Sequence, residues 1–77
     1  MTFYQKLIIK TLLRAPQNRL TRLKLLQKTY GDMDSFDLNR ALTGFERYVK
    51  TEVIDKTVYY RLSDEYVTLQ KYKSLFR

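Results

Sequence analysis

The chain has no cysteine and no histidine, and only one proline and two glycines among its 77 residues. Without cysteine there can be neither a disulfide framework nor a thiolate metal site. Without histidine the chain lacks the commonest metal ligand and the usual general base, so catalysis would rest on carboxylates alone. A domain this small also rarely forms a substrate pocket of ordinary volume. We therefore expect no enzymatic activity, no cofactor and no metal.

Long apolar runs are also missing. The first segment, MTFYQKLIIKTLLR, is interrupted by Lys6 and Lys10 and is far shorter than the ~20 apolar residues that span a bilayer. It does not read as a signal peptide either, so we expect a cytoplasmic protein that is not inserted in a membrane. The length allows one domain, 1–77, and 44% hydrophobic residues suffice for a single compact core.

Positive charge dominates, with a formal net charge of +7, and it is unevenly distributed. Residues 1–30 contain seven basic residues and no acidic one, whereas residues 31–65 contain five basic and eight acidic residues. Such a one-sided field favours a polyanionic partner, with nucleic acid ahead of an anionic membrane surface. A solvated basic face that only maintains solubility is the alternative.

Apolar residues at a 3.6-residue period predict a first helix from Thr2 or Phe3 to Arg14, which Pro16 ends. Ile9 and Leu13 fall outside its main stripe. We expect these two residues to form a second narrow apolar strip that the core of one chain leaves uncovered.

A second helix is predicted over residues 22–30, with Thr21 as its N-cap and Gly31 as its stop. Spacings of three and four residues place Leu23, Leu26 and Tyr30 on its inward face. The basic side chains of this segment are then expected on its outward face.

A third helix is predicted over residues 35–49, capped by Asp34 or Ser35. The apolar residues from Leu38 to Val49 share one face at helical spacing, and the opposite face carries arginines.

After the third helix, Val53-Ile54 and Thr57 to Leu62 are rich in β-branched and aromatic residues, which predicts a hairpin with its turn at Asp55-Lys56. Because a lone hairpin is barely stable in water, it must pack against the helices. Ser63 is expected to cap a last helix.

The predicted fold class is mostly α with a small β-hairpin (α+β), in the order helix-helix-helix-strand-strand-helix. The chain resembles a winged helix-turn-helix domain, the small DNA-binding fold of many bacterial, archaeal and viral regulators. The resemblance runs from Leu20 to about Tyr66. It is carried by Leu20-Thr21-Arg22, by the pattern Leu38-x-x-Ala41-Leu42-x-x-Phe45, and by the run VYYRLSDE that starts at Val58.

The resemblance implies binding of double-stranded DNA, with helix 35–49 in the major groove. Helix 22–30 and the wing would contact phosphates. The DNA-binding residues would then be, on or beside the third helix, Arg40, Arg47, Thr43, Asn39 and Lys50; around the second helix, Arg19, Arg22, Lys24 and Lys28; and on the wing, Lys56 and Arg61.

A homodimer is also expected, because two recognition helices could then enter successive major grooves. Its predicted interface consists of Ile9, Leu13, Leu69, Tyr72 and Phe76. The chain would act as a nucleoid-associated transcriptional regulator of viral or plasmid type. Two alternatives stay open: a winged protein–protein adaptor that does not bind DNA, and an RNA or single-strand binder that stacks bases on its tyrosines.

Overall fold

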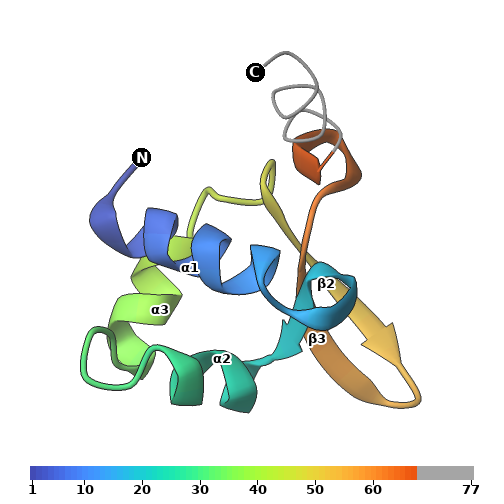
Figure 1. Cartoon of the computed structure of the whole chain (residues 1–77), viewed down its shortest axis with the longest axis horizontal. Helices are drawn as coiled ribbons and strands as arrows, with labels where there is room; N and C mark the ends of the chain where they lie inside the picture. The colour runs from blue at the N-terminus through green and yellow to red at the C-terminus, as the bar shows by residue number, and fades with distance from the viewer. Residues whose placement is uncertain (68–77) are drawn as a thin grey trace.

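The computed structural model describes residues 1–67 and shows a small α+β domain (Figure 1). Its last described residues, 64–67, are helical after Ser63, whose Oγ accepts the Tyr66 N–H at 3.2 Å. Among the described residues, no helix combines the length and the apolar character needed to cross a bilayer. The elements in chain order are α1 (Phe3–Leu13), η1 (Pro16–Asn18), β1 (Arg19–Thr21), α2 (Arg22–Lys28), α3 (Ser35–Leu42), β2 (Val49–Ile54) and β3 (Thr57–Leu62).

The sheet has three antiparallel strands in the order β1-β3-β2, so the predicted order with only a two-stranded ribbon is corrected. Leu20 of β1 lies opposite Tyr60 of β3, and Thr51 of β2 lies opposite Tyr60 on the other side. The β2–β3 turn falls at Asp55 and Lys56, as predicted. Both have positive φ, 49° and 67°, the geometry of a type I′ turn. The third strand gives the hairpin the support that it lacks alone.

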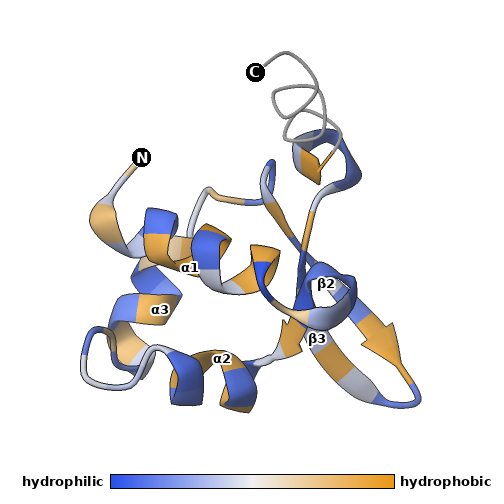
Figure 2. Ribbon diagram, viewed as in Figure 1, coloured by the Kyte–Doolittle hydropathy of each residue, from blue (hydrophilic) through white to orange (hydrophobic). Residues whose placement is uncertain are grey.

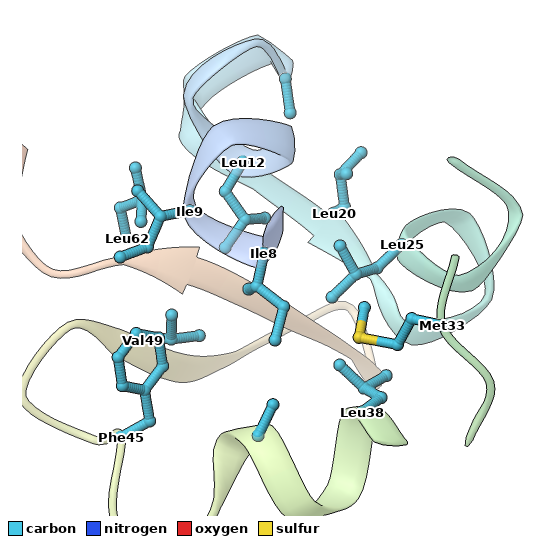
Figure 3. Close-up of a cluster of buried hydrophobic side chains, with 12 residues drawn as sticks. Ile8, Ile9, Leu12, Leu20, Leu25, Met33, Leu38, Phe45, Val49 and Leu62 are labelled. Atoms are coloured by element: carbon cyan, nitrogen blue, oxygen red, sulfur yellow. The ribbon is translucent and has the colours of Figure 1, made fainter. Parts of the chain in front are cut away.

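The core lies between α1, α2, α3 and the sheet (Figure 3). α1 contributes Ile8 and Leu12, both fully buried, and β3 contributes Leu62. Ile9, expected on an uncovered strip, is only 4% exposed and lies beside Leu62 in Figure 3. That expectation was wrong because the sheet covers a second side of α1. The segment bounds of α1 itself are confirmed.

The inward face of α2 differs from the prediction. Leu25 is fully buried, while Leu23 is 65% exposed and Tyr30, beyond the helix end at Lys28, is 89% exposed. Leu26, also predicted on the inward face, is partly buried against the core. Thr29 is buried as well, and its hydroxyl donates to the Leu25 carbonyl at 2.8 Å. Because this hydroxyl is hydrogen-bonded within the helix, Thr29 can be buried at little cost. The spacing of the leucines in this segment is compatible with more than one inward face.

α3 ends at Leu42, seven residues earlier than the predicted helix 35–49. Thr43 is its C-cap, and Gly44 follows with φ +71°, the left-handed conformation in which glycine commonly terminates helices. Phe45 and Val49 are buried as expected, but they reach the core from the turn and from β2. Because Phe45 and Val49 continue the apolar helical spacing beyond Leu42, the sequence pattern did not reveal where the helix ends.

Candidate nucleic-acid interface

The outward face of α3 carries Phe36, Asn39, Arg40 and Thr43, all exposed. On its inward face Leu38 is fully buried. The Arg40 guanidinium lies 5.8 Å from the centre of the Phe36 ring, a cation–π contact that leaves the cation in solvent. Within residues 1–67, no carboxylate lies within ion-pair distance of it. Arg40 and Asn39 thus have free hydrogen-bonding groups on an exposed helix face.

Both ends of α3 are held by hydrogen bonds. At its start, the Asp34 carboxylate accepts the Asp37 N–H at 2.8 Å, and the Asp37 carboxylate accepts the Asp34 N–H at 3.2 Å. This capping box satisfies two backbone donors that the helix leaves unpaired. Near its end, Gln5 Nε2 of α1 donates to the Ala41 carbonyl at 3.1 Å. Asp34 and Asp37 are therefore engaged in capping the helix.

Arg22 joins three elements. Its Nη2 donates to Ser35 Oγ at 2.7 Å, and its Nη1 donates to the Tyr60 hydroxyl at 3.3 Å. The side chain therefore connects the start of α2 to the start of α3 and to β3. Arg22 was predicted to contact a phosphate. It is half-buried and hydrogen-bonded within the chain, so it helps to fix the position of α3.

On the outer face of the sheet, the arginine side chains form ion pairs with nearby carboxylates. Glu52 Oε2 lies 3.5 Å from Arg19 Nη1 and 3.5 Å from Arg61 Nε, and Arg61 also pairs with Asp64 at 3.2 Å. The Arg19 guanidinium stacks over the Tyr59 ring at 5.5 Å. Two arginines and two carboxylates compensate one another, so Arg19 and Arg61 are not available to a polyanion; Lys50, opposite Arg61, is exposed on the same face.

Glu52 Oε2 is buried, yet neither arginine reaches it with the geometry of a hydrogen bond. The charges are close enough to attract each other, but a buried acceptor without a hydrogen bond loses part of its hydration energy. We therefore treat the contact as an electrostatic network of modest strength.

The two lysines of α2 lie on the side away from α3. Lys24 and Lys28 are exposed and four residues apart, so they share one face of the helix. Lys28 lines a hollow of about 240 Å³ together with Thr11, Arg14 and Ala15 at the end of α1. The structure thus does not bring these lysines together with Arg40 on one surface.

The remaining predicted cations lie beyond α3. Arg47 is exposed and pairs with Glu65 at 3.7 Å; it belongs to the turn before β2, not to the helix. Lys50 is exposed on β2, and Lys56 occupies the tip of the hairpin. Figure 1 shows the hairpin extending past the helices, and Lys56 lies in the turn between its two strands.

The predicted dimer residues do not form one surface in the described part of the chain. Ile9 is buried in the core, and Leu13 is 40% exposed. Leu69, Tyr72 and Phe76 lie outside the described residues. Among residues 1–67 the large apolar side chains that are exposed are Met1, Phe3, Leu13, Leu23, Tyr30, Phe36, Val53 and Val58.

Two hollows flank α3. One, about 400 Å³, lies between α3 and the start of α1 and is lined mostly by apolar surface, with Asp37 and Arg40 among its residues. The other, about 420 Å³, lies at the α2–α3 connection, where Leu26 and Tyr30 meet acidic side chains, Asp32, Asp34 and Asp37. Sequence reasoning missed both, because they depend on how separate elements pack.

No protein-family model, curated protein or solved structure matches this chain. The inference of function therefore rests on the geometry and the charges of the residues described above.

Proposed function

We propose that the protein is a small double-stranded DNA-binding regulator of the winged helix-turn-helix type. α2, its connection and α3 would form the helix-turn-helix, and β2 and β3 would form the wing. An α-helix with its side chains is about 10–12 Å in diameter, so α3 (Ser35–Leu42) can enter a major groove that is ~12 Å wide. No catalytic step is part of this proposal.

The observation that carries the proposal is the exposed, unpaired Arg40 on a helix that is braced at both ends. Arginine can donate two hydrogen bonds to guanine, and a neighbouring asparagine can do the same with adenine. Asn39 lies beside Arg40 on the exposed side, and Thr43, one helical turn after Asn39, is exposed as well. Because Leu38 on the opposite face is buried in the core, the helix that carries these side chains is held in place when they contact DNA bases.

The other cations take different parts in this proposal. Lys56, at the hairpin tip, would contact a phosphate beside the groove. Arg22 would position α3 through Ser35. Arg19 and Arg61 would keep the sheet rigid through Glu52.

The proposed partners and location follow from DNA binding. The protein would act as a homodimer on double-stranded DNA, in the cytoplasm and associated with the nucleoid. A two-fold arrangement would present two copies of α3 to successive major grooves, ~34–36 Å apart.

Binding to duplex DNA and the role of Arg40 can be tested together. Duplexes selected from a random library by the wild-type protein would be compared with unselected duplexes by fluorescence anisotropy. Wild-type affinity should fall steeply as salt rises, because cations displace counterions from phosphates. Arg40→Ala should lose about tenfold to a hundredfold of the preference for selected sites.

Arg47→Ala is the matched control, since Arg47 is exposed and lies outside α3. It should keep the preference for selected sites. If Arg40→Ala kept that preference as well, α3 would not be the reading element. If the wild type bound no duplex even at low salt, the proposal of DNA binding would fail.

A second candidate function is a protein–protein adaptor, and one feature favours it. The hollow at the α2–α3 connection combines exposed Tyr30 with Asp32, Asp34 and Asp37. An apolar surface rimmed by acids suits a basic peptide better than it suits DNA. Binding of a basic amphipathic peptide, abolished in Tyr30→Ala and unaffected in Arg40→Ala, would support the adaptor.

A further inference from the structure

β2 lies at an edge of the sheet, and the pairing pattern shows which of its residues bond to β3 and which face away from it. The Ser63 N–H donates to the Tyr48 carbonyl at 2.8 Å, so Tyr48 is bonded to the chain that continues β3. Hydrogen-bonded and non-bonded pairs alternate in antiparallel strands. Lys50, Glu52 and Ile54 therefore bond to β3, which is consistent with a turn bond at Ile54. The N–H and C=O groups of Thr51 and Val53 point away from the sheet.

This edge is open. Val49 N–H donates to the Phe45 carbonyl at 3.0 Å, but Thr51 and Val53 find no such backbone acceptor among residues 1–67. Both side chains are exposed, Val53 by 67%, and the end of β2 near the turn is coloured hydrophobic in Figure 2. The register with β3 runs without a bulge from Val49 to Ile54. Such an edge is a template for another strand.

We propose that β2 pairs antiparallel with β2 of a second copy of this chain, in the register that places Thr51 opposite Thr51. The run Val49-Lys50-Thr51-Glu52-Val53 is complementary to itself about this residue. Lys50 then lies opposite Glu52 of the second copy, and Val49 lies opposite Val53. The two sheets join into one continuous sheet of six strands, twice the three strands of one chain.

The charges select this register. Within one chain Lys50 lies directly opposite Arg61, a like-charge pair that destabilises a sheet. In the dimer each Lys50 instead gains a carboxylate, because Glu52 keeps 35% of its side chain exposed. Moving the second strand so that Thr51 faces Val53 would place Glu52 opposite Glu52, with repulsion in place of attraction.

The valines fit the same register. Val49 lines a hollow of about 260 Å³, below the 300–1,000 Å³ typical of ligand sites. Its other lining residues are Leu42, Glu46, Lys50, Thr51 and Tyr60. Val53 of the second copy, opposite Val49 and on the same face, would lie at the mouth of this hollow. In the symmetric pair, each exposed Val53 would thus pack against the buried Val49 of the other copy.

This interface gives the proposed homodimer a set of contacts other than Ile9 and Leu13, and it does not depend on DNA binding. The test is made without DNA, so its failure would leave the role of Arg40 untouched. Sedimentation equilibrium of the full chain over a wide range of concentrations should show a monomer–dimer equilibrium. A wild type that remains monomeric throughout overturns the inference.

Single cysteines test the register, and the absence of native cysteine leaves no competing thiol. In Thr51→Cys the two thiols would lie on directly opposed residues, whose Cα atoms are about 5.5 Å apart, within reach of a disulfide. In Val53→Cys the two thiols would lie about 14 Å apart along the strands. Thr51→Cys should form a disulfide dimer on oxidation and Val53→Cys should not. Equal cross-linking in both variants, or none in Thr51→Cys, overturns the register.

Charge reversal separates association from folding. Lys50→Glu places a carboxylate opposite Arg61 within the chain, so the fold should stay intact by circular dichroism. In the dimer it would face Glu52 of the second copy at two symmetric positions, and dimerisation should weaken about tenfold or more. Lys50→Arg keeps the positive charge and should dimerise as the wild type does. If Lys50→Glu dimerised equally well, the interface would be elsewhere.

Discussion

The exposed face of α3 and the outer face of the sheet both carry arginine, but they use it differently. Arg40 on α3 lies against the Phe36 ring, and within residues 1–67 its guanidinium pairs with no carboxylate. Arg19 and Arg61 on the sheet share Glu52. The same side chain can thus recognise a partner or stabilise the fold, depending on whether a carboxylate lies within reach.

The difference arises from strand pairing. β3 lies between β1 and β2, so residues far apart in the chain become neighbours on one face. Arg19 lies opposite Arg61, and Glu52 lies opposite Tyr59 next to it. Within residues 1–67, no carboxylate pairs with the outward side of α3. Its own acids, Asp34 and Asp37, are engaged in its N-terminal cap. Position in the sheet therefore removes two arginines from the candidate DNA surface.

The largest expected effect comes from the buried side of α3. Leu38→Ala removes a fully buried side chain and should lower the free energy of unfolding by about 2–5 kcal/mol, measured by urea denaturation. Asn39→Ala, one residue away on the exposed side, should change it by less than about 0.5 kcal/mol. Equal losses in the two variants would contradict the assignment of the two faces.

Gly44 tests the boundary between α3 and the strand that follows. Its φ of +71° lies in the left-handed region, and a Cβ at this position would meet no atom within 4 Å. Gly44→Ala should therefore cost about 1–2 kcal/mol of stability through backbone strain alone. Asparagine tolerates this region better than alanine, so Gly44→Asn should cost less. A gain of about 0.5–1 kcal/mol in Gly44→Ala would instead indicate a helix that continues through this residue.

The smallest effect is expected on the sheet. Glu52→Gln would leave Arg19 and Arg61 without their shared carboxylate, but all three side chains are about one-third exposed. Solvent screening limits the loss to about 1 kcal/mol. This loss should shrink at high salt. Glu46→Gln, an exposed carboxylate before β2, serves as the control and should leave stability unchanged at every salt concentration. A loss that does not depend on salt would show that packing, rather than charge, is involved.

Several features near the candidate site could be predicted from the chain. The first helix, the N-caps at Thr21 and Asp34, and the hairpin turn at Asp55 and Lys56 are confirmed. The end of the third helix could not be predicted, because Phe45 continues the apolar spacing beyond Gly44. As a result Arg47, predicted on the recognition helix, lies outside it.

The amino-acid sequence by itself determined the features that depend on residues within about four positions of one another. Capping bonds and tight turns are of this kind, since their donors and acceptors are near neighbours in the chain. Only the tertiary structure decided that Leu25 is buried rather than Leu23, and that Glu52 lies near two arginines while Arg40 pairs with no carboxylate of the described part of the chain. Burial and ion pairing depend on which distant elements meet, and an apolar or charged residue can satisfy more than one such arrangement.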